Sequence, residues 1–146
     1  MTLTGPCSGW GSEMQLSGFF AYAQTTGDVT IRVAPRFLAE QSDAEAGCWV
    51  WSYHVRLENN GEKPVQLLRR HWFITDGKGQ MSEVEGEGVL GEQPVIEPGG
   101  SFDYISGCPL PTTSGQMVGT YLMQVDDTCF EVAIPAFSLV QPAGAA

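Results

Sequence analysis

The chain has 146 residues, of which 42% are hydrophobic and 16% are charged. The length and the hydrophobic fraction are typical of one globular domain, whereas the charged fraction is low. A chain this long buries enough surface to fold without a metal or a disulfide. Its formal net charge of −10 at pH 7 argues against nucleic acids and anionic membranes as partners, because both are polyanions. Small cations and neutral or basic partners remain compatible with this charge.

The cysteines and the N-terminal region predict a cytoplasmic protein. Cys7, Cys48, Cys108 and Cys129 are far apart in the sequence, and without a sign of secretion we expect free thiols. The apolar run that ends at Ala23 has no lysine or arginine before it, whereas a signal peptide begins with positive charge. No stretch approaches the roughly 20 apolar residues of a membrane helix.

In chain order, the first predicted segment is residues 1–27, which are rich in glycine, serine and threonine. We expect an N-terminal extension there that is only partly ordered. Residues 28–140 form the predicted domain, because apolar residues recur in them at every second position, as in strands with one buried face. Residues 141–146 form a short tail. The expected strands are 29–33, 49–57, 65–76, 81–85, 101–105, 117–125 and 129–134.

Turn-forming residues separate these strands. Asn59-Asn60-Gly61 and Asp76-Gly77 can supply the positive φ angles of tight hairpins, and Pro98-Gly99 fits a type II turn. The segment 37–48 has room for one helical turn at most. About seven short strands at this spacing predict an all-β fold, an antiparallel sandwich of two sheets.

Six sequence motifs, in the same order, resemble those of the ApaG family and cover about residues 28–140. They are Arg69-Arg70-His71-Trp72-Phe73-Ile74-Thr75-Asp76, the loop from Val84 to Pro94, Pro98-Gly99-x-Ser101-Phe102, Ser106-Gly107-Cys108-Pro109-Leu110, Gly115-x-Met117-x-Gly119-x-Tyr121-x-Met123 and Ile134-Pro135-x-Phe137-x-Leu139.

The resemblance implies an immunoglobulin-like or fibronectin type III-like β-sandwich of about seven to eight strands. It also implies a bacterial cytoplasmic protein, or the same domain used as an interaction module in eukaryotic F-box and polymerase-interacting proteins. The family is linked genetically to cobalt and magnesium tolerance and to the operon of a dinucleoside tetraphosphate hydrolase. No settled biochemical activity comes with the resemblance, and residues 1–27 lie outside it.

The glycine-rich segment 86–96 is the sharpest candidate site. Gly86, Gly88 and Gly91 have the Gly-x-Gly-x-x-Gly spacing of a dinucleotide-binding turn. That turn must open a helix, and Pro94 and Pro98 follow instead, so a Rossmann site is rejected.

A weaker anion site remains open in the same segment. Glycine-rich backbone can form a nest of N–H groups for pyrophosphate or a dinucleoside polyphosphate, with Arg69 and Arg70 nearby and a divalent cation as a helper. The surrounding glutamates oppose this hypothesis, since they would repel phosphate. The alternative is that the glycines only let a long loop bend. The glutamates are Glu83, Glu85, Glu87 and Glu92.

Metal binding and catalysis are not predicted. The glutamates could hold Mg²⁺, but in an acidic chain such charges usually form a solvated face, and no known ligand spacing occurs. His54 falls on the polar face of its strand and is expected to be exposed, and His71 to make a structural hydrogen bond. Cys108 with His71 as base would be a nucleophile, yet no third orienting group is visible, so we predict no enzyme and no cofactor.

The sequence therefore predicts a non-catalytic domain that binds a protein partner through the segment 86–96 and neighbouring sheet edges. Val89 and Leu90 would contact the partner, with the alternative that they fold back onto the core. An exposed edge strand would also permit a homodimer. The residues assigned to the partner-binding or anion-binding loop are Gly86, Gly88, Val89, Leu90, Gly91, Gln93, Arg69 and Arg70.

Overall fold

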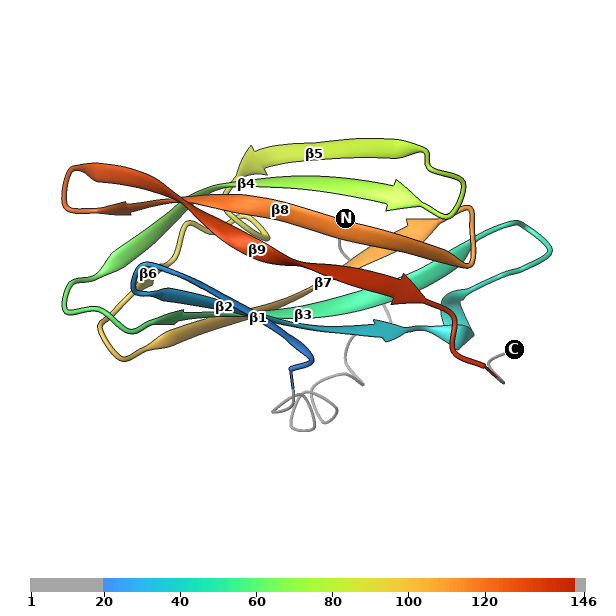
Figure 1. The fold of residues 1–146 in the computed structure, drawn as a ribbon, viewed down its shortest axis with the longest axis horizontal. Helices are drawn as coiled ribbons and strands as arrows, with labels where there is room; N and C mark the ends of the chain where they lie inside the picture. The colour runs from blue at the N-terminus through green and yellow to red at the C-terminus, as the bar shows by residue number, and fades with distance from the viewer. Residues whose placement is uncertain (1–19, 144–146) are drawn as a thin grey trace.

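A computed structural model describes residues 20–143, and most of them lie in β-strands (Figure 1). No helix among these residues is long and apolar enough to cross a membrane. The elements are β1 (Tyr22–Thr26), β2 (Val29–Phe37), the single 3-10 turn η3 (Ala39–Gln41), β3 (Trp49–Asn59), β4 (Val65–Asp76), β5 (Met81–Glu87), β6 (Val95–Ile96), β7 (Ser101–Leu110), β8 (Ser114–Val125) and β9 (Thr128–Val140).

The strands form two antiparallel sheets that face each other, which confirms the predicted sandwich. The first sheet has the order β1-β2-β3-β7, and the second has the order β5-β4-β8-β9, with β6 paired to β4. Figure 1 shows the sheets as two layers, and the buried core residues come from both of them. The structure adds β1 and β6, which the sequence did not predict, because β1 is polar and mostly exposed and β6 has only two residues.

The core follows from the two-residue alternation of the long strands. On β3, every second side chain from Trp51 to Leu57 faces inward and is at most 5% exposed, while the residues between them point to the outer face. Tyr121 of β8 and Phe137 of β9 meet this row from the second sheet, and both are buried. Each such large apolar side chain contributes roughly 1.5–3 kcal/mol on burial, so the alternating pattern accounts for the pairing of the sheets.

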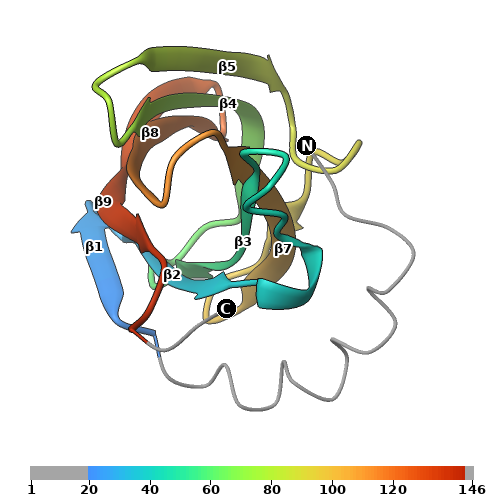
Figure 2. The same ribbon diagram turned by 90° about the vertical axis from the view of Figure 1, so that its right-hand side faces the viewer.

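One side of the sandwich is closed and the other is open (Figure 2). On the closed side β9 runs beside β1, where the Ala133 amide donates to Thr26 Oγ1 at 3.2 Å. On the opposite side β5 and β7 are the last strands of their sheets. Each of them therefore has one backbone edge with no neighbouring strand in the described part of the chain.

Two of the three predicted turns occur, although the positive φ angle of the β4–β5 turn is at Gly79 and not at Gly77. Asp76 and Gly79 close the β4–β5 hairpin, and Gly100 donates to the Glu97 carbonyl with Gly99 at φ 77°, as in a type II turn. Asn59-Asn60-Gly61, however, is not a hairpin, because the chain passes there from β3 in the first sheet to β4 in the second.

The expectation that His54 is exposed is wrong. His54 does lie on the outer face of β3, but it is only 4% exposed. The ring of Phe20 packs edge-on against its imidazole, with centroids 5.0 Å apart, and Arg56 lies over the same phenyl ring. Both Phe20 and β1 belong to the stretch 1–27 that was expected to be only partly ordered. Residues 1–19 of that stretch lie outside the described residues.

Candidate functional site

The loop between β5 and β6 is held by its own backbone. The Val89 amide donates to the Glu92 carbonyl at 2.8 Å, and the Glu92 amide donates back to the Val89 carbonyl at 2.9 Å. Gly88 and Gly91 have φ angles of 63° and 79°, in the left-handed region that favours glycine. A Cβ atom on Gly88 would also collide with the Glu92 carbonyl oxygen, so the tight turn requires glycine at this position.

Arg70 ties this loop to β4 from the inside of the sandwich. It stands opposite Gly86 in the β4–β5 register, and its Nη1 donates to the carbonyls of Glu87 at 3.2 Å and Gly88 at 2.9 Å. A Cβ atom on Gly86 would lie 2.8 Å from Arg70 Nη1. Gly86 therefore leaves room for the arginine, which is a different role from that of Gly88.

Several N–H groups of the loop are already paired within the chain. The Gly88 amide donates to the Leu68 carbonyl at 2.8 Å, and those of Val89 and Glu92 are paired with each other. An anion nest needs such groups to point together at the ligand. The backbone of this loop instead directs two carbonyl oxygens at Arg70, so the hydrogen bonds favour a bending role for the glycines over the nest hypothesis.

The residues predicted to form the binding loop differ in burial and in their contacts. Val89 is 1% exposed and belongs to the core, whereas Leu90 is 47% exposed and has a φ of 49°. Gln93 donates from Nε2 to the Leu68 carbonyl at 2.9 Å. Arg69 is exposed on the outer face of β4, opposite Glu87. Of the two alternatives for the apolar pair, the structure has Val89 folding back onto the core and Leu90 facing solvent.

A cleft of about 440 Å³ opens between the sheets on the open side of the sandwich. Leu90 and Gly91 line it from the loop, and the other walls come from β3, β4, β5, β7 and β8. A concave site with apolar walls and a few converging polar groups is the usual form of a ligand site. The aromatic lining residues are Tyr53, Trp72 and Tyr104, and the polar ones include Arg70, Ser106 and Cys108.

Buried hydroxyl groups lie deep in this region. The hydroxyls of Tyr104 and Tyr121 form a hydrogen bond between the two sheets. Burial raises the pKa of both phenols well above the usual value, and burial raises the pKa of Tyr53 to about 12. All three tyrosines are therefore neutral near neutral pH, and Arg70 is the cationic side chain that lines the cleft.

The structure does not assemble a Cys108–His71 dyad. Cys108 is buried on the inner side of β7, and burial raises the pKa of its thiol to about 11. A thiol with a raised pKa is a poor nucleophile, since the thiolate is the reactive form. His71 lies on the outer face of the opposite sheet, where its partners are Glu83 and Glu85.

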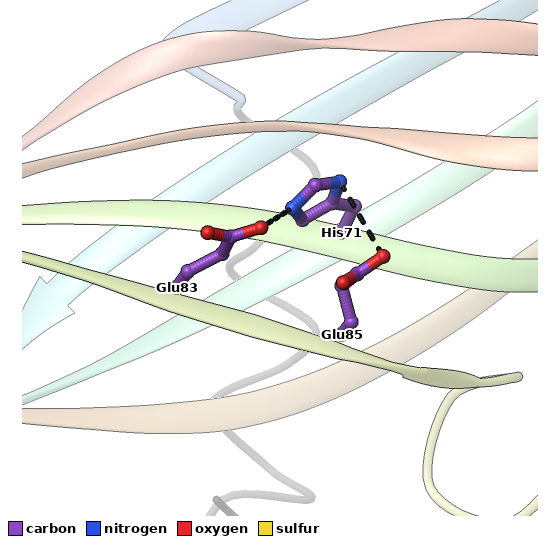
Figure 3. A group of neighbouring side chains, drawn as sticks. All are labelled: His71, Glu83 and Glu85. Carbon is purple, nitrogen blue, oxygen red and sulfur yellow. Dashed lines mark hydrogen bonds and ion pairs between the residues drawn. The ribbon is translucent and has the colours of Figure 1, made fainter.

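His71, Glu83 and Glu85 form a cluster on the outer face of the β4–β5 hairpin (Figure 3). Nε2 of His71 lies 2.5 Å from a carboxylate oxygen of Glu83, and Nδ1 lies 3.8 Å from one of Glu85. The Phe73 ring packs on the imidazole with centroids 4.5 Å apart. The ligand atoms of the three residues lie within 4.8 Å of one another, so these side chains could hold a divalent cation.

The sequence prediction for His71 named a hydrogen bond but not its partners. They could have been found from the hairpin, because a turn at 76–80 pairs His71 with Glu85, and the two-residue period then puts Glu83 on the same face. The sequence analysis assigns the glutamates to one solvated face, and it therefore does not predict this cluster.

Comparison with known proteins agrees with the fold. The family model described as the ApaG domain matches residues 39–125. A Protein ApaG of Paramagnetospirillum magneticum is 54% identical over 122 residues, which are 83% of this chain and 94% of that protein. One of Caulobacter vibrioides is 51% identical over 126 residues, or 86% of this chain and 90% of that protein.

A solved structure shows the same similarity. The crystal structure of the putative ApaA protein from Bordetella pertussis superposes with a TM-score of 0.77 at 47% sequence identity. The match covers 80% of this chain and 95% of that one. The family match, the sequence relatives and the shared two-sheet fold lead to one conclusion: the chain belongs to the ApaG domain family.

Proposed function

We propose that this domain is a non-catalytic binding module that holds a segment of a partner protein at its open side. The rim of the cleft is the observation that supports the proposal most directly. Leu90 is 47% exposed there and has a left-handed φ of 49°, a conformation that costs a branched residue about 1–2 kcal/mol. A strained backbone that presents an apolar side chain to solvent is typical of a binding surface.

The surroundings of Leu90 suit an extended segment. β5 and β7 flank the cleft and have unpaired backbone edges among the described residues, to which a partner strand could add. The cleft behind the rim would accept an apolar side chain between Tyr104 and Trp72. The net charge of −10 favours a neutral or basic partner over an acidic one.

The test separates binding from folding. Val89 is unsuitable for it, because its side chain is 1% exposed and its loss would destabilise the core. Leu90→Asn removes the apolar contact, and asparagine tolerates a left-handed backbone. The matched control is Met81→Asn, since Met81 is 65% exposed at the far end of β5.

Peptides are selected from a displayed random library on the immobilised full chain, and their affinities are measured by calorimetry. Leu90→Asn is expected to weaken them roughly tenfold or more, the equivalent of about 1.5–3 kcal/mol for one buried leucine, while Met81→Asn leaves them unchanged. A library that yields no binder, or binders that do not distinguish Leu90→Asn from wild type, would refute the proposal.

Pyrophosphate or dinucleoside polyphosphate binding is the second candidate. The observation that favours it is Arg70, whose hydrogen bonds within the described residues come from Nη1 alone, so that the rest of its guanidinium can face the cleft. Calorimetric titration with pyrophosphate, with and without Mg²⁺, tests it. Saturable heat that disappears in Arg70→Gln would support anion binding at the cleft. Titrations without heat, both with and without Mg²⁺, would refute anion binding.

The proposal also covers two properties implied by the family resemblance. It places the domain in the cytoplasm, and it treats cobalt and magnesium tolerance as a consequence of partner binding. A strain that lacks the chain should then regain tolerance with Met81→Asn but not with Leu90→Asn. Equal rescue by both variants would show that cobalt and magnesium tolerance does not depend on the surface around Leu90.

A further inference from the structure

We propose that His71, Glu83 and Glu85 form a binding site for a first-row divalent transition-metal ion such as Zn²⁺. The site lies on the outer face of the second sheet, whereas Leu90 and the cleft line the open side of the sandwich. The three side chains therefore face away from Leu90 and the cleft. One imidazole nitrogen and one oxygen from each carboxylate would be the protein ligands.

The strands hold the three ligands in one place. His71 and Glu85 are directly paired across the β4–β5 hairpin, and Glu83 is two residues away on the same face. Packing of Phe73 against the imidazole restricts the ring. Ligands on paired strands are positioned more rigidly than ligands on loops, so the cluster differs from a patch of independent surface acids.

The ligand atoms lie farther apart than around a bound ion, but near enough to reach one ion together. Tetrahedral ligands about 2.0 Å from Zn²⁺ are about 3.3 Å apart. The contacts of 2.5 Å to Glu83 and 3.8 Å to Glu85 are made by different ring nitrogens of His71, Nε2 and Nδ1, and only one of these can bind a given ion. One ligand atom from each of the three residues lies within 4.8 Å of the other two. All three side chains are 30–55% exposed, so small rotamer changes can bring the ligands onto one ion, with the remaining positions filled by water.

Local charge favours a cation at this point. Glu87, the next glutamate along the outer face of β5, stands opposite Arg69, whereas Glu83 and Glu85 have His71 as their basic neighbour. Two carboxylates that share one imidazole repel each other. A divalent ion between them would remove that repulsion.

The ligand types select the class of ion. Mg²⁺ and Ca²⁺ prefer shells made only of oxygen, whereas an imidazole nitrogen favours Zn²⁺ and the neighbouring transition metals. Three protein ligands leave at least one position of a tetrahedral ion open. The site would thus be an open, surface metal site and not a closed structural one.

The experiment follows the imidazoles of the full chain by long-range proton–nitrogen spectra during a Zn²⁺ titration at neutral pH. The chain has two histidines, and buried His54 is an internal control because it is 4% exposed. We expect the His71 nitrogen signals to shift saturably with one ion per chain, while those of His54 stay in place. Mg²⁺ at the same concentration should leave both unchanged.

Variants identify the ligands. Glu83→Gln and Glu85→Gln keep the side-chain shape and are each expected to weaken Zn²⁺ binding at His71 by about tenfold or more. The matched control is Glu87→Gln, on the same strand and face but outside the cluster, and it should bind like wild type. The proposal is overturned if His71 does not respond to Zn²⁺, if Mg²⁺ shifts it equally, or if Glu87→Gln weakens binding as much as Glu83→Gln.

Discussion

The Tyr104–Tyr121 hydrogen bond joins the two sheets through the core, and its removal allows a quantitative test of the packing. Tyr104 lies on β7 of the first sheet and Tyr121 on β8 of the second, at 6% and 0% exposure. Among the described residues each hydroxyl has the other as its side-chain partner. In Tyr104→Phe the remaining Tyr121 hydroxyl would be buried and unpaired, which costs about 1–3 kcal/mol.

The double variant Tyr104→Phe/Tyr121→Phe removes both polar groups and keeps both rings. Because no unpaired hydroxyl remains, we expect it to be less destabilised than the sum of the two single variants by at least about 1 kcal/mol. Tyr22→Phe is the control, since the Tyr22 hydroxyl accepts only a long hydrogen bond of 3.4 Å from the Ser138 amide. It should change the free energy of unfolding by less than about 0.5 kcal/mol.

Urea unfolding monitored by tryptophan fluorescence gives the free energies, and equal m-values show that the variants unfold from comparable states. Two results would refute the reasoning. One is additivity of the single variants in the double variant, and the other is a Tyr104→Phe variant as stable as wild type. Either result would mean that the two hydroxyls do not depend on each other for hydrogen bonding.

Two further predictions concern the same side of the sandwich. Burial raises the folded-state pKa of the three interior tyrosines, to about 12 for Tyr53, and of Cys108 to about 11. The free energy of unfolding should therefore be constant up to about pH 9 and fall as the pH rises through the folded-state pKa values. Each group contributes a loss of up to about 1.4 kcal/mol per pH unit, and a urea midpoint that does not change with pH in this range would contradict the prediction. An alanine in the left-handed region costs about 1–2 kcal/mol. Gly91→Ala, with open space around its Cβ position, should lower the free energy of unfolding by that amount, and Gly88→Ala should lower it by more. Equal losses in the two variants would contradict the clash with Glu92.

The fold was largely predictable because its evidence is local. The alternation from Trp51 to Leu57 determines which face of β3 is buried, and it can be read without any tertiary contact. The Asn59 turn shows where local evidence ends. Its residues suit a hairpin, but the Asn59 side chain is buried and donates to the Ile96 carbonyl at 2.9 Å, across the start of the second sheet. No local pattern reveals a partner so distant in the sequence.

His54 shows the same limit on the outer surface. The alternation of β3 correctly puts it on the outer face, and an outward residue of a sheet normally meets water. Phe20 covers it instead. That aromatic residue lies in a stretch without periodicity, so the sequence does not connect it with the imidazole.

The candidate site depends on a single irregularity of β4 that the sequence does not show. The β4–β8 register shifts between Leu67 and Arg69, so that Leu68 is an extra residue in the strand. Before the shift Val65 and Leu67 face inward, and after it Trp72 faces inward. A one-residue shift exchanges the two faces of a strand. Simple alternation from Leu67 would have put His71 inside and Arg70 outside, which is the reverse of what the structure has.

The loop after β5 holds this irregularity in place. The Leu68 carbonyl accepts hydrogen bonds from the Gly88 amide and from the Gln93 side chain, and Arg70 returns a bond to the Gly88 carbonyl. The glycine-rich segment therefore determines which side chains of β4 face the cleft and which face solvent. Because His71 and Arg70 point to opposite faces, a ligand-removing change at Glu83 should spare peptide binding at the cleft, whereas Gly88→Ala should disturb both sites together.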